Sequence, residues 1–455
     1  MLGPKLLTAR LVARLTRLSG RGAGTSLPGK VLMRLEPSAI EQLSSRLDRG
    51  SAVISATNGK TTTAAMVASI LEQGGSKLVH NSAGANMSGG IATTLLDAAH
   101  GSRMSGDTGL FEVDEFWLAD VVRQVHPKAL LLANLFRDQL DRYGELEAIA
   151  DRWKELASGL RSTRLILNAD DPMVAGLGAD EARTGIVHFG VEDTSMALAG
   201  MQHASDAKHC RVCGHLYRYD AVFLGHLGHY HCDNCGATRP VPQVAATSVV
   251  LDGVRGARVT ISTPTGEIDV SLPLPGLYNV YNALGAVALA TAMGATLKES
   301  AAGLRAVRPA FGRAETIKVE GRELLLLLIK NPAGANEVLR TLVLEDGQHD
   351  LFCVLNDKIA DGRDISWIWD ADFEHLAPRV RRAVCSGTRA AEMGLRLKYA
   401  GIPEQSIVVI DSLPEALDAA VAGSEQRVMA LPTYTAMLEL RELLASRGLV
   451  RGQFT

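Results

Sequence analysis

Apolar and polar positions alternate along the chain in a strand-then-helix rhythm. In the first two thirds, strand-length apolar runs lie at residues 51–55, 109–113, 129–134 and 164–168. Helical patterns lie between them, beginning with 62–72 and ending with the alanine-rich segment 277–293. Strands that alternate with helices predict an α/β fold whose parallel sheet is covered on both faces.

A second α/β unit follows a composition change at residues 307–313. Predicted strands lie at 323–329, 350–356, 382–386, 406–411 and 427–431, with helices at 388–399 and 435–445 among them. The pattern predicts a Rossmann-like C-terminal domain, but its start has no G-x-G-x-x-G, so the fold does not imply a dinucleotide. We therefore expect a lead-in over 1–50, a central domain over 51–310 and a C-terminal domain over 311–455.

Length and composition agree with this division. A chain of 455 residues exceeds what one hydrophobic core supports, and 47% hydrophobic with 21% charged residues is typical of a globular enzyme. The net charge of −3 argues against nucleic acid as a partner. No apolar run reaches the roughly 18 residues of a membrane span, and no secretory signal is visible, so a cytoplasmic location is expected.

The N-terminus has an unusual charge distribution, because no acidic residue precedes Glu36. Leucines at 7, 11, 15 and 18 recur at helical spacing among arginines, which predicts a basic amphipathic helix over 4–19. Such a helix either rests on anionic lipid at the inner face of the plasma membrane or packs on the protein with solvated arginines. The residues alone leave both interpretations open.

A phosphate-binding loop is predicted after the first strand. Its residues are Thr57, Asn58, Gly59, Lys60, Thr61 and Thr62. The first glycine of the Walker pattern is replaced by Ile54, but the strand–loop–helix setting is the one that a phosphate loop needs. In such a loop Lys60 reaches the β- and γ-phosphates, and the Thr61 hydroxyl binds magnesium.

Further motifs give this loop a family. The loop resembles the T-N-G-K-T-T segment of the Mur ligases and folylpolyglutamate synthases, and five similar segments follow in the same order. They lie around Glu112, at 134–144, at 168–172, at 276–283 and at 311–315. The resemblance implies that Glu112 binds magnesium with Thr61, that Asn279 and Asn282 lie by the adenine of ATP, and that Arg313 contacts the γ-phosphate. Gln139 and Tyr278 stand where the family usually has histidines, which puts a second metal site in doubt.

Four of the six cysteines form two C-x2-C pairs, Cys210 with Cys213 and Cys232 with Cys235. Two such pairs at this separation supply four thiolates for tetrahedral zinc, and a closed four-cysteine site is structural. We expect a zinc ribbon inserted at about 201–244. The isolated Cys353 and Cys385 are interpreted as buried small hydrophobes in a reducing compartment.

The insertion and the C-terminal domain narrow the resemblance. The segment K-N-P-A-G at 330–334 and the segment D-G-R-D-I-S-W at 361–367 resemble the MurT family, the synthetase subunits of lipid II isoglutaminyl synthase. The resemblance implies a GatD-type glutaminase partner that contacts the C-terminal domain, with Asp364, or failing that Asp361, completing a Cys-His-Asp triad. From the residues alone, these aspartates equally suit a turn that caps backbone groups.

The implied reaction uses ATP to amidate the D-glutamate α-carboxyl of the stem peptide on lipid II, through an acyl phosphate and ammonia from the glutaminase. Two alternatives stay open: an amino-acid ligase of the Mur or folylpolyglutamate type, and a zinc-ribbon binding protein that uses ATP as a conformational switch.

Overall fold

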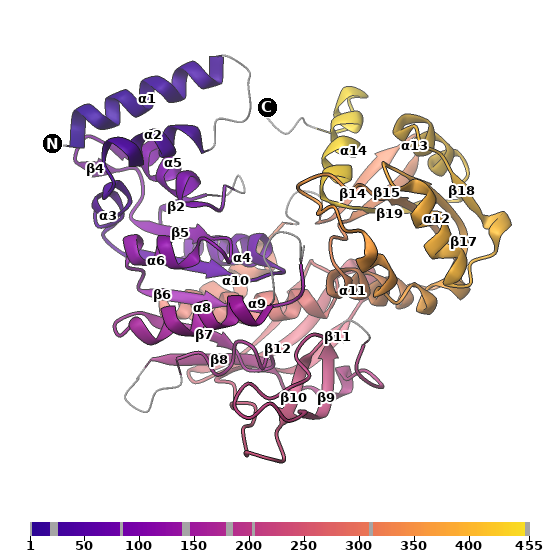
Figure 1. Ribbon diagram of the computed structural model, residues 1–455, viewed down its shortest axis with the longest axis horizontal. Helices are drawn as coiled ribbons and strands as arrows, with labels where there is room; N and C mark the ends of the chain where they lie inside the picture. The colour runs from indigo at the N-terminus through magenta and orange to yellow at the C-terminus, as the bar shows by residue number, and fades with distance from the viewer. Residues whose placement is uncertain are drawn as a thin grey trace.

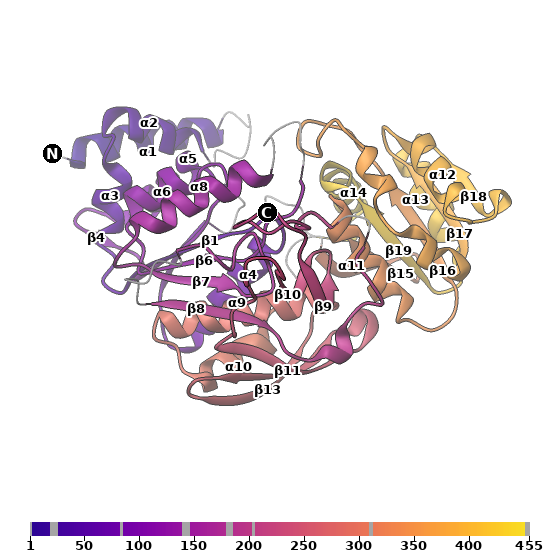
Figure 2. The ribbon, with the colours of Figure 1, turned by 60° about the horizontal axis from the view of Figure 1, so that its bottom comes forward.

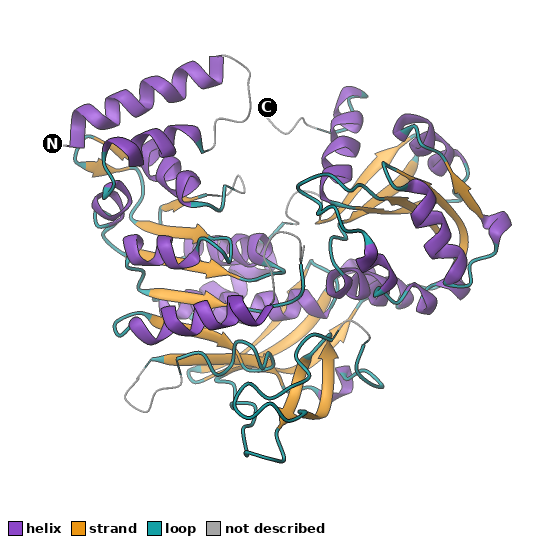
Figure 3. Ribbon diagram, viewed as in Figure 1, coloured by secondary structure: helices purple, strands orange, loops and turns teal. Residues whose placement is uncertain are grey.

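The computed structural model describes residues 2–18, 26–81, 85–138, 146–178, 185–202, 205–308 and 313–450. Within them lie two large sheets with helices packed against them (Figures 1 and 3). The first sheet has nine strands in the spatial order β13 (Gly266–Leu272), β12 (Ala257–Thr263), β11 (Val244–Leu251), β8 (Ile186–Val191), β7 (Arg164–Asn168), β6 (Ala129–Leu132), β1 (Gly50–Ser55), β5 (Thr108–Glu112) and β2 (Leu78–His80).

The first sheet is mixed rather than parallel as predicted. In the spatial order of this sheet, all neighbours from β2 through to β11 pair in parallel. The pairs β11–β12 and β12–β13 are antiparallel. The connections 252–256 and 264–265 are too short for the crossover that a parallel pair requires, so these strands reverse direction. The prediction held for the strands that carry the phosphate loop.

Two hydrophobic cores lie on opposite faces of the first sheet, because successive strand residues point to opposite sides. Ile54 faces a core formed with α4 (Lys60–Gln73), α9 (Leu277–Ala292) and α10 (Leu297–Ala306). Val53 faces a second core. The helices of this second core include α5 (Ser88–Ala98), α6 (Leu118–Val125) and α8 (Leu146–Gly159).

Three N-terminal helices, α1 (Leu2–Leu18), α2 (Leu27–Leu35) and α3 (Ala39–Ser44), lie at one end of this unit. Helix α1 packs against α2 and α5, burying Leu6, Ala9 and Ala13, so one face follows the packed interpretation. The expected leucine stripe points elsewhere: Leu7 is 67% exposed and Leu11 59%. No described helix is long and apolar enough to cross a membrane.

The second sheet has six strands in the order β14 (Arg313–Val319), β15 (Arg322–Leu327), β19 (Arg427–Pro432), β16 (His349–Val354), β17 (Val380–Ser386) and β18 (Ile407–Val409). All neighbours are parallel except the hairpin of β14 and β15. Its helices are α11 (Pro332–Val343), α12 (Ala390–Tyr399), α13 (Leu413–Ala422) and α14 (Tyr434–Ser446).

The cysteine-bearing insertion contributes the antiparallel pair β9 (Arg218–Leu224) and β10 (Leu227–His231). Figures 1 and 2 both place this hairpin near α11, where the two large units meet. Two hydrogen bonds fix the contact: Arg340 of α11 donates to the carbonyl of Phe223 and to that of Met196, both at 2.8 Å. The insertion therefore contacts the second unit directly.

Candidate active site

The phosphate loop lies between the carboxyl end of β1 and the first turn of α4, as predicted. Gly59 has a left-handed backbone (φ 86°), and a Cβ on it would come within 2.1 Å of the Asn282 side-chain oxygen. Both facts require glycine, the first for the backbone and the second for space. The structure thus brings the loop against Asn282, which is 223 residues away in the sequence.

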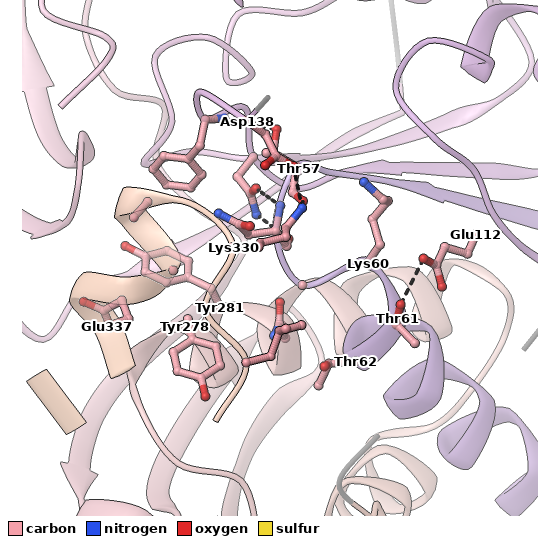
Figure 4. Close-up of a pocket in the computed structure, with 18 of the residues that line it drawn as sticks. Thr57, Lys60, Thr61, Thr62, Glu112, Asp138, Tyr278, Tyr281, Lys330 and Glu337 are labelled. Carbon is pink, nitrogen blue, oxygen red and sulfur yellow. Dashed lines mark hydrogen bonds and ion pairs between the residues drawn. The ribbon is translucent and has the colours of Figure 1, made fainter. Parts of the chain in front are cut away.

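The loop lines a cavity of about 750 Å³ to which both units contribute. Figure 4 shows Lys60, Thr61 and Glu112 on one side of this cavity and Tyr278, Tyr281 and Glu337 on the other. The lining residues from the second unit include Leu327, Leu328, Lys330, Ala333, Gly334, Glu337, Val338 and Tyr434. Hence the cavity is built from sequence-distant parts, although only its loop carries a phosphate motif.

Lys60 is held by two oxygen partners. Its ammonium donates to the Ala56 carbonyl and to Glu115, 2.7 Å from the carboxylate. Burial lowers the pKa of Lys60, but the carboxylates of Glu115, Asp114 and Glu112 together outweigh it and hold that pKa above its ordinary value. Lys60 therefore stays charged at neutral pH, as a phosphate ligand must.

The two predicted magnesium ligands lie together. The Thr61 hydroxyl donates to the Glu112 carboxylate at 3.0 Å, and Glu112 is buried at the end of β5. Asn81 fixes this strand end by bonding both the N–H and the carbonyl of Glu112, at 2.9 and 2.8 Å. A hydroxyl and a carboxylate are hard oxygen donors, so these residues fit a magnesium ion.

Asparagine and lysine side chains connect the loop to the rest of the site. Asn58 and Asn134 exchange two hydrogen bonds, from the Asn58 N–H to Asn134 at 2.9 Å and back to the Asn58 carbonyl at 3.0 Å. Asn331 of the second unit donates to the Asn58 side chain at 3.0 Å. Lys330 donates to the Thr57 carbonyl at 3.3 Å and pairs with Asp138 at 2.5 Å. The second unit thus places an additional cation beside the phosphate loop.

The predicted adenine residues line the cavity, but their amides bond within the protein. Asn282 accepts from the Thr63 hydroxyl at 3.2 Å and donates to Asn279 at 3.0 Å. Asn279 in turn donates to the Pro275 carbonyl at 2.7 Å. Tyr278, which stands in place of the family's histidine, also lines the cavity.

Residues 168–172 do not line the cavity but hold in place residues that do. Asp170 accepts from the Tyr281 hydroxyl at 2.7 Å and from Arg239 at 2.5 Å. Asp171 accepts from the Leu135 N–H at 2.9 Å and lies 3.3 Å from His226, at the turn of the inserted hairpin. Both carboxylates are buried, so this motif connects β7, α9 and the insertion rather than facing the ligand.

The four predicted zinc ligands also converge. Their sulfur atoms lie within 4.8 Å of one another, with 3.6 Å between Cys210 and Cys235 and 3.5 Å between Cys213 and Cys232. Each pair ends in a left-handed glycine whose N–H donates to the carbonyl of the first cysteine, Gly214 at 2.8 Å and Gly236 at 2.9 Å. Four thiols on two matching turns fit one tetrahedral zinc ion.

Asp361 and Asp364 lie in different environments although three residues apart. Asp361 is buried and bonds both the N–H and the hydroxyl of Thr435 at the start of α14. Asp364 is exposed and accepts from the Ser366 N–H at 2.8 Å. Of these two aspartates, Asp364 is the exposed one.

Some expectations lie outside the described residues. Gln139 and segment 141–144 belong to 139–145, and residues 309–312 are likewise not described. Arg313 opens β14, but its side chain lies outside the described part.

Sequence reasoning missed several residues of the cavity. Lys330 had a usable signal, since it follows an apolar strand at the edge where open sheets bind ligands. Leu224 and Leu227 of the inserted hairpin, and Glu337 of α11, had none. Their places in the cavity depend on how the two units pack.

Comparison with known proteins identifies the fold of this chain. The family model described as Mur ligase middle domain matches residues 54–239, and the one described as MurT ligase C-terminal matches 328–437. The structure of a pseudomurein peptide ligase type C from Methanothermus fervidus superposes with a TM-score of 0.68 at 23% identity, covering 89% of this chain and 80% of that one. Fold and phosphate loop together define the Mur ligase class.

Full-length relatives are more specific. The lipid II isoglutaminyl synthase (glutamine-hydrolyzing) subunit MurT of Streptococcus pneumoniae is 34% identical over 95% of both chains. The protein of the same name from Staphylococcus aureus strain N315 is 32% identical, over 98% of this chain and 99% of its own. The chain belongs to the MurT family of ligase subunits.

Proposed function

We propose that this chain uses ATP to amidate the α-carboxyl of D-glutamate in the stem peptide of lipid II. The observation that carries the proposal is the full-length relationship to two lipid II isoglutaminyl synthase subunits. The cavity supports it, because it combines a phosphate loop with two cationic side chains, Lys60 and Lys330.

The reaction would proceed in two displacements. An oxygen of the substrate carboxylate attacks the γ-phosphorus of ATP, and the bond between the γ-phosphorus and the β,γ-bridging oxygen breaks. ADP departs, and the substrate becomes an acyl phosphate. Ammonia attacks the acyl carbon, loses a proton and expels phosphate, which leaves the amide. Lys60 and Lys330 would offset the charge on the transferring group, with Arg313 as a further candidate. Magnesium held by Thr61 and Glu112 would neutralise phosphate charge.

The reaction is tested with the full chain co-expressed with a GatD-type glutaminase. Given lipid II, ATP and ammonia, the complex should replace a stem-peptide hydroxyl by an amino group, which mass spectrometry of the peptide detects. Products formed instead from UDP-muramyl peptides and amino acids would point to an amino-acid ligase. ATP hydrolysis without an amide product would point to a conformational switch.

We propose that a GatD-type glutaminase supplies the ammonia and docks near Asp364. The exposure of Asp364 favours it over Asp361, whose carboxylate is already bonded to Thr435. Exposed apolar side chains are also present on this unit, at Ile359, Trp369 and Tyr399, and such groups favour a protein partner.

A substitution tests the triad role. Asp364→Asn should lower the rate of glutamine-dependent amidation by about 10²- to 10⁴-fold, because a triad carboxylate orients the histidine of the glutaminase. Amidation with added ammonia should be unchanged, and Asp346→Asn provides a control at an exposed aspartate of the same unit. Equal loss with both nitrogen sources would contradict the assignment.

We propose that a structural zinc ion joins Cys210, Cys213, Cys232 and Cys235, and that the chain divides into a lead-in over 1–50, a central domain over 51–310 and a C-terminal domain over 311–455. Metal analysis of the purified chain tests the zinc. One zinc per chain that is lost in Cys232→Ser is expected, whereas an unchanged metal content would contradict it.

We also propose that α1 touches the inner face of the plasma membrane through Leu7 and Leu11, which are exposed beside the partly exposed Arg10 and the exposed Arg14. Vesicles with phosphatidylglycerol should sediment the chain, and vesicles of phosphatidylcholine alone should not. Leu7→Ser combined with Leu11→Ser should abolish the difference; persistence of binding would reject this role.

A further inference from the structure

Glu337 is an acidic residue in an unusual place. It lies on α11, lines the cavity and is 1% exposed. Among the described residues, neither carboxylate oxygen has a hydrogen-bond partner. The nearest cation, Arg340, is 3.8 Å away and already donates to the carbonyls of Phe223 and Met196.

A buried acid without a hydrogen-bond partner is costly, because it has lost its bonds to water and gained no hydrogen bond in return. Elsewhere in this cavity, buried acids are paired, as Glu115 is with Lys60 and Glu112 with Thr61. Glu337 therefore stands out as a polar group directed at something other than the protein.

The surroundings of Glu337 indicate the chemistry of that ligand. Leu224, Leu227, Val338, Tyr278 and Tyr281 line the same cavity. Figure 4 shows Tyr278, Tyr281 and Glu337 together, across the cavity from Lys60. Since Lys60 marks the phosphate end, this apolar and aromatic end suits the planar base rather than a charged or sugar group.

Adenine carries one exocyclic donor, the 6-amino group. Asn279 and Asn282 already bond to each other, to Thr63 and to Pro275. Resting on the proposed use of ATP, we infer that Glu337 is a specificity residue whose carboxylate accepts a hydrogen bond from the adenine 6-amino group. The aromatic and leucine side chains then cover the faces of the ring.

Titration calorimetry on the full chain tests this with two ligands that differ only in the 6-amino group, ADP and purine riboside 5′-diphosphate. Wild type should bind ADP about 10- to 100-fold more tightly, as expected for a buried hydrogen bond to a charged acceptor. Glu337→Ala should reduce this ratio to about 3-fold or less, mainly by weakening ADP.

Two further variants separate recognition from structure. Glu337→Gln keeps an acceptor oxygen and should retain most of the ratio. Glu415→Ala, an exposed acid on α13, is the matched control and should match wild type. A merely structural role for Glu337 would weaken both ligands equally and leave the ratio of Glu337→Ala at the wild-type value.

That last result would overturn the inference and leave the proposed amidation intact. Absence of ADP binding by wild type would overturn both. Melting temperatures measured alongside identify any variant that does not fold, and in that case the Gln variant carries the comparison, with a ratio at or below 3-fold counting against the inference.

Discussion

The phosphate end and the base end of the cavity are built differently. At the phosphate end, Lys60 is paired with Glu115, and Asn58 with Asn134 and Asn331. At the base end, Glu337 has no hydrogen-bond partner among the described residues. A triphosphate with magnesium brings enough charge to replace pairs between protein side chains. The polar groups at the phosphate end can therefore be paired with one another before the ligand binds. A neutral base brings few polar groups, and a waiting unpaired acceptor raises selectivity for the base that supplies the donor.

The largest expected effect breaks the phosphate end. Lys60→Ala should lower kcat/KM for ATP in amidation by about 10³-fold, because it removes a cation aimed at the transferring phosphoryl group. It also leaves Glu115 buried with its main partner gone, which adds negative charge where phosphate must bind. Steady-state kinetics measure the loss, and the exposed Lys154→Ala serves as control. Less than tenfold loss would show that Lys330 suffices.

The next largest expected effect is a pH dependence of stability that arises at the base end of the cavity. Burial raises the pKa of Glu337 from its ordinary value of 4.5 to about 7. Between these values the unfolded chain gives up its proton and the folded one keeps it, so the free energy of unfolding falls as pH rises. Glu337→Gln should therefore match wild type near pH 5 and exceed its stability near pH 8 by at most about 3 kcal/mol.

Melting temperatures of the ligand-free chain at the two pH values check this, with Glu415→Gln as control. Saturating ADP should reduce the difference in melting temperature between Glu337→Gln and wild type at pH 8, because the bound base gives the wild-type carboxylate a hydrogen-bond partner. A gap that does not change with pH would contradict the buried, unpartnered state of Glu337.

Metal removal tests whether the insertion supports the base end. Leu224 and Leu227 reach the cavity from the hairpin that joins the two cysteine pairs. A chelator or Cys232→Ser should weaken ADP binding by about 30-fold, since on the order of 2 kcal/mol of apolar contact depends on the hairpin. Titration calorimetry measures it, and the exposed His215→Ala is the control. Unchanged affinity would make the insertion independent of the cavity.

The smallest effect concerns the connection between the two units. The Asn331 side chain caps α11 by accepting from the Gly334 N–H at 2.9 Å and also donates to Asn58. Asn331→Ala should cost about 1 kcal/mol through the lost cap. Asn331→Asp keeps the cap oxygen and should cost less in melting temperature. If both variants lose equally, the bond to Asn58, and not the cap, carries the stability.

The sequence by itself determined the local chemistry of this protein. The phosphate loop and the two C-x2-C turns lie where the motifs predicted, because strand, turn and glycine requirements act over a few residues. The pairing of Thr61 with Glu112, which are 51 positions apart, was implied by the family resemblance instead. Strands β1, β5, β6 and β7 were predicted to within about one or two residues for the same reason. Resemblance over the whole length supplied the family, which no single motif could.

Tertiary structure alone decided which distant residues share the cavity. Asn331 meets Asn58 across 273 positions, and Glu337 looks in the sequence like any solvated helical acid. Periodicity shows that a helix has an apolar face but not what covers it: in α1 the protein covers Leu6 and Ala9, whereas Leu7 and Leu11 stay exposed. The phosphate end could be read from a motif because its chemistry is contiguous. The base end exists only where the two units and the insertion pack together.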